Sequence, residues 1–492
     1  MSATVEIPGG IAANRASSGL QVEGEVVQRV VVDRSCRLPV LFFFAAGLAW
    51  LLLGSLFGFI ASFKMHHPEF LADWSWLTWG RVRVAHLNMV AYGWASQAGI
   101  GVGIWLMSRL CRAPLRAPGL TLVAGLFWNL GVTIGVAGIL AGHSQSIEWL
   151  EFPKYATPLL FVAYALVGIW AVLMFVNRRP GHVYVSQWYL FAAFLWFPWL
   201  YGTANVIMQA FPLKGVTYGA VNWWFAHNVL GLWFTPIGLA AAYYMIPKVI
   251  GRPVHSYYLS ALGFWSLALF YSWNGMHHLI GGPFPIWLIT ASVVASFMML
   301  IPVLTVAINH HMTMRGHFGR LAESPTLRFT VFGAMIYTLV SLQGVSMAIP
   351  AWNKITHFTH YTVGHAHLGM YGFFSMIMFG SMYYIVPRLV GCEWRSPTLI
   401  KWHFWLSAYG IILMVLALSV GGFLQGAYLL DPATPFEYVV KSTMLFLQSR
   451  SVSGVAIASA HLIFGFHFAL MLLRLGRTGG EATTFLSREV RS

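Results

Sequence analysis

The sequence predicts an all-α, polytopic membrane protein with twelve transmembrane helices. Three observations lead to this prediction. The 492 residues are 58% hydrophobic and only 9% charged, a composition that soluble domains of this size do not have. Apolar runs of roughly 20 residues recur along the chain, and each is long enough to cross a bilayer. Positive charges gather in every second loop between these runs.

The predicted spans follow one another closely and leave a polar tail at each end. We expect a flexible cytoplasmic tail over residues 1–37, a twelve-helix domain over 38–473 and a second cytoplasmic tail over 474–492. The N-terminal segment lacks an apolar core with a cleavage site, so it does not look like a signal peptide. The twelve spans are expected at residues 38–63, 84–109, 118–144, 156–177, 186–210, 220–249, 258–281, 284–309, 325–350, 360–391, 401–427 and 451–473.

The net charge of +15 follows membrane topology and does not indicate a nucleic-acid partner. With the N-terminus inside, 21 of the 29 Lys and Arg residues fall in the tails and in the loops that would face the cytoplasm. This positive-inside bias predicts that both termini are cytoplasmic. The eight cations on the other side are Lys64, Arg81, Arg83, Lys154, Lys214, Lys354, Lys441 and Arg450.

Histidine dominates the polar residues within the spans, because none of the 14 acidic residues lies in the middle of one. Histidine is a common ligand of haem iron and copper. At a rise of about 1.5 Å per residue, six histidines on four spans reach a similar depth in the outer third of the bilayer. This shared layer predicts metal binding by His86, His227, His277, His278, His365 and His367.

The remaining histidines have a simpler explanation. A single histidine in a membrane helix often forms a hydrogen bond to a neighbouring helix, which is what we expect of His143, His403, His461 and His467. Loop histidines are expected to be solvated, namely His66, His67, His310 and His311.

The spacing of His365 and His367 places them on opposite sides of one helix, because successive residues turn by about 100°. They cannot share a metal, so the span at 360–391 would separate two metal centres. One of them is expected to pair with His86.

His277 and His278 are about 100° apart at the end of their predicted span. They can bind one ion together with His227 from the preceding span. Three histidines with an open position suit copper or zinc, or non-haem iron with an added carboxylate. The six histidines together predict a bis-His haem, a mono-His haem and a tris-His metal facing it.

Five segments carry a specific resemblance to a known family: "RVRVAHLNMVAYGWA", "EWLEFP", "WWFAHNVLGLWFTPIGLAAAYYMIPK", "YSWNGMHHL" and "HYTVGHAHLGMYGFFSMIMFGSMYYIVPRLVG". Together with the twelve-helix plan, they resemble subunit I of the haem–copper oxidases, most of all the cbb3 type. The resemblance implies that fold over nearly the whole chain. It also implies a low-spin haem b on His86 and His367, a high-spin haem b3 on His365, and a copper, CuB, on His227, His277 and His278.

The position of one tyrosine distinguishes the subfamilies. The aa3-type oxidases place the catalytic tyrosine four residues after the first copper histidine, and nitric oxide reductases place an iron-binding glutamate there. This chain has Gly231 at that position. Tyr271 instead lies seven residues before His278, two turns deeper on the same face. The resemblance implies a catalytic Tyr271 linked covalently to His227, and the alternative is a buried aromatic whose hydroxyl bonds a neighbour.

The resemblance implies a terminal respiratory oxidase of the bacterial cytoplasmic membrane that reduces O2 to water and is coupled to proton translocation. Protons would move from the cytoplasmic side along a K-type channel that includes Tyr243 and Ser260 and ends at Tyr271. The alternative for "AAAYYMIP" is an ordinary interfacial aromatic pair.

Glu148 and Glu151 could accept a calcium ion near the haem propionates, as the resemblance also implies. The alternative is a pair of solvated carboxylates beside Lys154. The chain has no CxxCH motif and no copper-thiolate motif, so the electrons are expected to come from membrane-anchored c-type cytochrome subunits.

Two other functions remain open. One is a nitric oxide reductase on the same scaffold, against which Gly231 and Tyr271 count. The other is a twelve-helix transporter without a redox centre. Transporters place their polar groups near the midplane of the bilayer, whereas these histidines are displaced outward.

Overall fold

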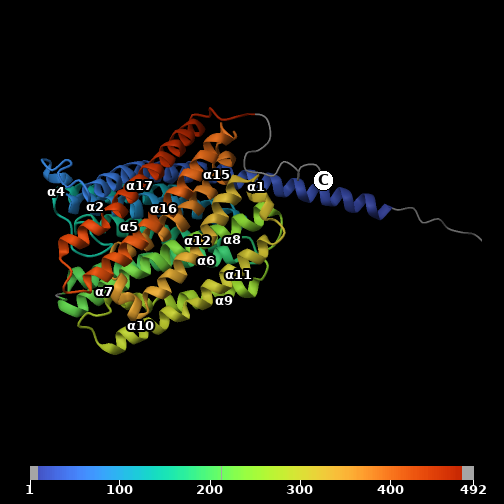
Figure 1. The fold of residues 1–492 in the computed structure, drawn as a ribbon. Coiled ribbons are helices and arrows are strands. Elements are labelled where there is room, and N and C mark those ends of the chain that lie inside the picture. The colour runs from blue at the N-terminus through green and yellow to red at the C-terminus, as the bar shows by residue number, and fades with distance from the viewer. Residues whose placement is uncertain (1–8, 212, 479–492) are drawn as a thin grey trace, which may run out of the picture.

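The computed structural model describes the backbone of residues 9–211 and 213–478, and the side chains from residue 25 onward. Within these ranges the chain is almost entirely helical, and the long helices pack side by side as one bundle (Figure 1). Ten helical stretches are long and apolar enough to cross a membrane. They are α1 (Gly9–Lys64), α4 (Pro118–Ala141), α5 (Thr157–Val176), α6 (Val185–Ala210), α7 to α8 (Gly215–Ile250), α10 to α11 (Ile286–Met314), α12 (Pro325–Met347), α14 to α15 (His360–Val390), α16 (Pro397–Leu429) and α17 (Phe436–Leu472).

Two further helical segments complete the twelve. The first consists of α2 (Trp79–Asn88) and α3 (Ser96–Leu110), which pack against α1, and the second is α9 (Tyr257–Tyr271), which packs against α11 (Leu300–Met314). The predicted all-α, twelve-helix architecture is therefore confirmed. A short helix, α13 (Pro350–Thr356), connects α12 to α14.

Two of the spans lie in the middle of the bundle. The most apolar part of Gly215–Ile250 is 83% buried and that of His360–Val390 is 94% buried, compared with 33–50% for the other eight stretches. A helix enclosed by protein on all sides needs no polar face. These two enclosed spans carry His227, His365 and His367 into the interior.

Three spans are interrupted by π-helical turns, and each turn starts within three residues after a predicted ligand. They are η2 (Met89–Ala95) after His86, η3 (Leu230–Phe234) after His227 and η6 (Leu368–Ser375) after His367. A π-turn widens the helix and is frequent at functional sites. The hydrophobic pattern of the sequence did not indicate these turns.

The N-terminal prediction needs a correction, because α1 begins at Gly9 and not near residue 38. The helix continues past the bundle (Figure 1). Its polar part is anchored to α3, since Asp33 accepts a hydrogen bond from Trp105 Nε1 at 2.9 Å and pairs with Arg109 at 3.0 Å. Residues 1–8 and 479–492 of the two expected tails lie outside the described residues.

The predicted span at 258–281 is also corrected. Helix α9 ends at Tyr271, and His277 and His278 lie in a separate 3-10 turn, η4 (Asn274–Leu279). A Cβ on Gly275 would lie 2.6 Å from the Trp223 carbonyl oxygen. Glycine at this position therefore lets η4 approach α7 (Gly215–Val229) more closely than another residue would.

Candidate metal centre

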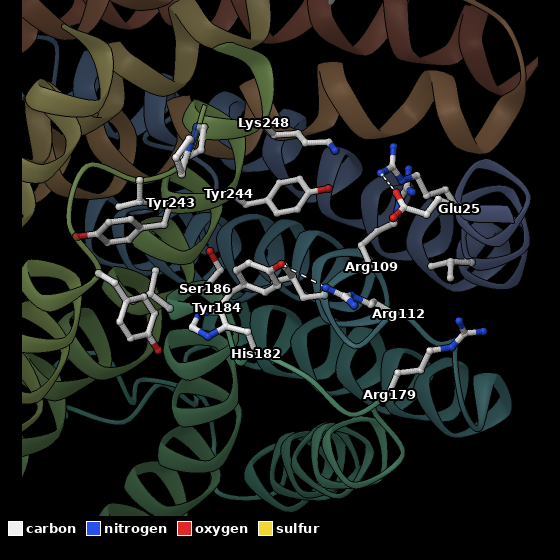
Figure 2. Close-up of a pocket in the computed structure, with 18 of the residues that line it drawn as sticks. Glu25, Arg109, Arg112, Arg179, His182, Tyr184, Ser186, Tyr243, Tyr244 and Lys248 are labelled. Carbon is white, nitrogen blue, oxygen red and sulfur yellow. Dashed lines mark hydrogen bonds and ion pairs between the residues drawn. The ribbon is translucent and has the colours of Figure 1, made fainter. Parts of the chain in front are cut away.

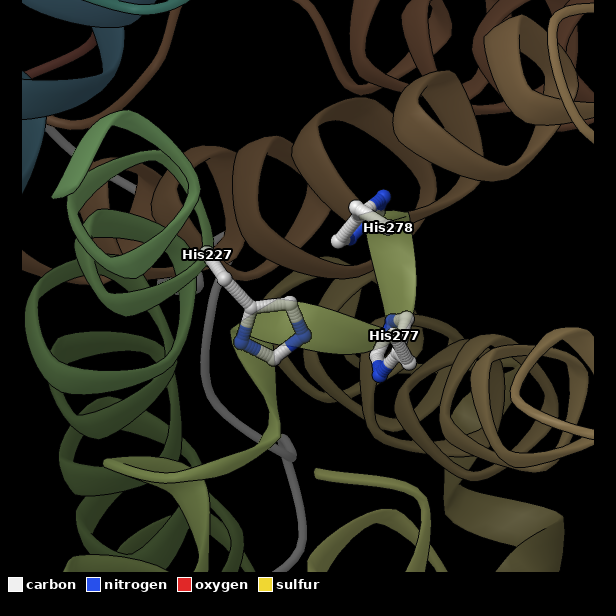
Figure 3. Close-up of side chains that lie close together, drawn as sticks. All are labelled: His227, His277 and His278. Atoms are coloured by element: carbon white, nitrogen blue, oxygen red, sulfur yellow. The ribbon is translucent and has the colours of Figure 1, made fainter. Parts of the chain in front are cut away.

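Three histidines from two elements converge on one point. His227 comes from α7, and His277 and His278 come from η4, so that the rings face a common space from two sides (Figure 3). One nitrogen from each ring lies within 4.8 Å of the other two. This is the one cluster of three metal-binding side chains found in the part of the chain that the structure describes. Its chemistry suits copper or zinc.

Neighbouring side chains orient these three rings. His277 Nδ1 lies 2.8 Å from Ser296 Oγ, and the ring of His278 stacks on Trp223 with centroids 4.1 Å apart. Such partners fix the ring orientation and leave the other nitrogen for the metal. His227 Nδ1 is buried without a hydrogen-bond partner among the described residues. A bond to a metal would satisfy the unpaired imidazole, so the residues fit a metal ion.

His86 and His367 face each other across a gap. Their rings are nearly parallel, at 18°, with centroids 6.3 Å apart. Parallel rings in face-to-face contact would be separated by only about 3.5–4 Å, so these two rings are not stacked in contact. His86 Nδ1 lies 2.7 Å from the Gly54 carbonyl oxygen and His367 Nδ1 lies 2.8 Å from that of Val363. A carbonyl only accepts, so each Nδ1 donates and each Nε2 keeps a free lone pair. This donor set fits a bis-His haem iron.

His365 lies on the other side of the same helix. Its Nδ1 is 3.2 Å from Gln343 Oε1 on α12. It is an electrostatic neighbour of His227, His277 and His278, whereas the histidine neighbour of His367 is His86. Helix α14 (His360–His367) therefore stands between a paired site and a site that faces the three-histidine cluster.

Tyr271 lies beside the first histidine of the cluster. Its ring centroid is 4.5 Å from that of His227, with 33° between the planes. A Cβ on Gly231 would lie 1.8 Å from Tyr271 Cε1, so the phenol ring fills the space that a side chain at position 231 would need. The expected alignment of Tyr271 with His278 along one helix is wrong, because α9 ends at Tyr271.

The two residues of the predicted proton path are connected through a third. Tyr243 and Ser260 are both buried. Asn309 Nδ2 lies 3.5 Å from Tyr243 Oη and donates to the Ser256 carbonyl oxygen at 2.8 Å. Ser260 Oγ lies 3.4 Å from the same oxygen. Asn309 was not predicted from the sequence, because it falls at the predicted end of a span.

Tyr337 on α12 is a further residue that was not predicted from the sequence. It lines the histidine cavity together with Tyr271. Its hydroxyl is buried and has no hydrogen-bond partner among the described residues. It is an electrostatic neighbour of both Tyr243 and Tyr271. A single tyrosine in an apolar span gives no sequence signal for this position.

The two carboxylates lie in the loop between α4 and α5. Glu148 Oε1 is 3.4 Å from Arg83 Nη2, so its cationic neighbour is Arg83, while Lys154 is exposed. Glu151 is buried and accepts from Asn88 Nδ2 at 3.1 Å, while its other oxygen has no partner among the described residues. Burial, and then the charge of Glu148, raise the pKa of the Glu151 carboxyl to about 7.

Two arginines on the histidine cavity were not recognised from the sequence. Arg83 and Arg450 both line it, and Arg450 contacts Met65 Sδ at 2.9 Å. A guanidinium binds a carboxylate strongly, so both can hold the propionates of a haem. The sequence did contain a signal for these arginines, because both are among the eight cations on the side of the membrane where the positive-inside bias predicts few.

Three of the four histidines expected to have packing roles do so. His403 bonds Tyr383 at 2.8 Å, His461 bonds Tyr371 at 3.0 Å, and His467 accepts from a backbone N–H at 3.1 Å. The expectation for His143 is wrong, because it lies exposed past the end of α4, where its Nδ1 is 3.1 Å from the Tyr155 hydroxyl. The expectation for two loop histidines is also wrong. His310 is buried in α11, and His66 bonds Ser451 at 2.8 Å.

The comparisons with known proteins agree with this geometry. The family model described as "Cytochrome C and Quinol oxidase polypeptide I" matches residues 38–456. The chain belongs to this family. It is a haem–copper oxidase subunit I, and cytochrome c oxidase subunits are among its similar relatives.

Among the relatives, a cytochrome c oxidase subunit 1 homolog of Azorhizobium caulinodans is 30% identical over 86% of this chain and 80% of the relative. The cbb3-type cytochrome c oxidase subunit CcoN1 of Stutzerimonas stutzeri is 32% identical over 77% and 81%. A nitric oxide reductase subunit of the same organism is 24% identical over 81% and 87%. A solved haem–copper terminal oxidase dimer shares the fold, with a TM-score of 0.68, 16% identity and coverage of 93% and 86%.

Proposed function

We propose that the chain is the catalytic subunit of a cbb3-type cytochrome c oxidase, which reduces O2 to water and is coupled to proton translocation. The observation that carries this proposal is the position of Tyr271, 4.5 Å from the ring of His227 and packed over Gly231. A phenol beside a metal-binding histidine can supply a proton and an electron at the place where O2 would be reduced. The cbb3-type relative supports the same assignment.

Each cofactor would be bound by its own subset of the six histidines. His86 and His367 would hold a low-spin haem b, His365 a high-spin haem b3, and the cluster of His227, His277 and His278 a copper. When bound, these groups supply electron transfer and an open coordination position for O2. The chain itself fixes the imidazoles through Gln343, Ser296 and backbone carbonyls, and it encloses the site in apolar helices that exclude water.

Proton delivery is proposed to run from Tyr243 and Ser260 through Asn309 and Tyr337 to Tyr271. Asn309 contributes a contact of 3.5 Å to Tyr243, and the free hydroxyl of Tyr337 supports a place in the middle. Electrons are proposed to come from membrane-anchored c-type cytochrome subunits, with both termini of this chain in the bacterial cytoplasm.

Glu148 and Glu151 are proposed to bind calcium near the propionates. The unpartnered, buried oxygen of Glu151 supports a cation at this position. Calcium takes oxygen ligands of this kind.

Nitric oxide reduction is the alternative, and the relative at 24% identity shows that the scaffold extends to that class. An additional carboxylate ligand at position 231 is incompatible with the ring of Tyr271, which favours O2.

The test is to purify the complex and measure its visible spectrum, its metal content and its gas consumption together. We expect two b-type haems and one copper in this chain, and O2 uptake with reduced c-type cytochrome. A non-haem iron in place of copper, with NO uptake and no O2 uptake, would overturn the proposal.

A further inference from the structure

A second cavity opens at the opposite end of the bundle from the histidines. It has a volume of about 1070 Å³ and lies among α1, α3, α8 (Thr235–Ile250) and the segments that precede α6 and α9. A single carboxylate, Glu25, lines it, together with six cations. Figure 2 shows that Lys248 and the Tyr244 hydroxyl point into the space that the arginines border. We call this the basic cavity, and its six cations are Arg29, Arg109, Arg112, Arg179, Lys248 and Arg252.

Most of this positive charge is not neutralised. Arg109 pairs with Asp33 at 3.0 Å and Arg29 pairs with Glu25 at 2.9 Å. No carboxylate in the described part of the chain forms an ion pair with the other four cations. The cavity therefore presents an excess of positive charge that a bound anion would balance.

The backbone holds two of the arginines at the cavity in a constrained arrangement. Arg112 has a φ of +52°, in the left-handed region that favours glycine. Its carbonyl accepts from Gln28 Nε2 at 2.5 Å, and the backbone N–H of Arg179 donates to the Cys111 carbonyl at 3.0 Å. Arg112 Nη2 also reaches the Tyr184 hydroxyl at 3.4 Å.

Aromatic residues place the basic cavity at the level of lipid headgroups. Tyr184 and Tyr257 line it and are themselves exposed, and Trp188 is exposed one turn further along α6. Exposed tyrosine and tryptophan of this kind mark the membrane–water interface. Below them, exposed Leu262 and Trp265 on α9 offer an apolar surface along which acyl chains can lie.

We propose that the basic cavity binds the phosphate of an anionic phospholipid headgroup. Guanidinium groups bind phosphate oxygens in a bidentate manner, and basic pockets between membrane helices suit anionic lipids. The charge distribution predicts that this end faces the cytoplasm. The inference goes beyond the proposed oxidase activity and does not rest on it, since no residue of the histidine cluster takes part.

The experiment measures equilibrium binding of a fluorescent phosphatidylglycerol to the purified complex in detergent, with phosphatidylcholine as the neutral comparison. The double variant Arg112→Gln/Arg179→Gln should bind phosphatidylglycerol about 25-fold more weakly, since each cation near a membrane surface contributes about fivefold. The matched control, Arg116→Gln/Lys401→Gln, removes two exposed cations from the same end that do not line the cavity, and should change binding less than twofold.

The conservative double variant Arg112→Lys/Arg179→Lys keeps the charge and should retain most of the binding, even where the glutamine variant does not fold. Added salt should weaken binding in the wild type. Wild-type affinity in a folded glutamine variant, equal losses in the control, or equal binding of phosphatidylcholine would overturn the proposal. Displacement of the lipid by micromolar inorganic phosphate would also overturn it, in favour of a soluble anion.

Discussion

The histidine cavity and the basic cavity occupy opposite ends of one bundle and are built in opposite ways. In the first, buried helices present imidazoles whose second nitrogens are mostly fixed by another partner, as with His86 and Gly54 at 2.7 Å. In the second, helix ends and loops present cations, most of them exposed, to an open space. Electron chemistry at a metal depends on the position of each atom, whereas attraction of a headgroup depends on summed charge. Single substitutions should therefore be decisive at the first cavity and graded at the second.

The largest expected effect comes from His227→Ala. Loss of one of three copper ligands should lower O2 reduction roughly a thousandfold, about 4 kcal/mol of transition-state stabilisation. The low-spin haem spectrum should persist, because His86 and His367 are not touched. Oxygen uptake measures the loss of activity, and the visible spectrum of the reduced protein measures the low-spin haem. Normal O2 uptake by this variant would contradict the prediction that single substitutions are decisive at the histidine cavity, because the three-histidine cluster would then not be the site of O2 reduction.

His367→Ala should remove the low-spin haem and lower the haem b content from two to one per chain. The low-spin haem proposed between His86 and His367, whose ring centroids are 6.3 Å apart, would lose one of the two histidines that would hold it. Haem extraction and the low-spin absorption band measure the change. As a control, the exposed His143→Ala should keep both haems. Full haem content in the His367 variant would contradict the assignment of this pair.

Gly231→Ala sharpens the comparison because it adds one carbon atom to the histidine cavity. The new Cβ would lie 1.8 Å from Tyr271, so the phenol must move away from His227. Displacement of a reacting group by about 1 Å can cost a hundredfold in rate, and overpacking costs about 1–3 kcal/mol of stability. Turnover and thermal unfolding measure these effects. Gly119→Ala, which has no atom within 4 Å of the new Cβ, is the control and should behave like the wild type.

The smallest expected effect is on stability and concerns Glu151. Its pKa in the folded protein is about 7, above the ordinary value of 4.5. Between these pH values the unfolded chain releases its proton while the folded chain keeps it, so the free energy of unfolding should fall as pH rises and level off above pH 7. The total fall is about 3 kcal/mol.

Thermal unfolding from pH 4 to 8 measures this fall. Glu151→Gln should abolish it, whereas the exposed Glu69→Gln should leave it unchanged. Calcium at pH 8 should stabilise the wild type but not the Glu151 variant. If the stability of the Glu151→Gln variant had the same pH dependence as that of the wild type, a raised pKa of Glu151 would not be the cause of the fall.

The number of spans and the layer of histidines could be predicted, because both follow from hydrophobic length and from a regular rise per residue. Local departures from regular geometry could not. The end of α9 at Tyr271 and the 3-10 turn with His277 depend on the close approach of Gly275 to α7, which is a tertiary contact. The neighbours that single out Asn309 and Tyr337 lie on other helices, and single-residue patterns carry no information about such neighbours.

The π-turn after His367 has a consequence for how the chain tolerates length changes. Such a turn holds one residue more than an α-turn in the same rise. Deleting a single residue within η6 would convert it to regular helix and swivel His365 and His367 by about 100° relative to α15 (Met376–Val390). The rotation of the half of this span that carries His365 and His367 thus depends on one extra residue, so insertions and deletions, more than substitutions, would turn both imidazoles together.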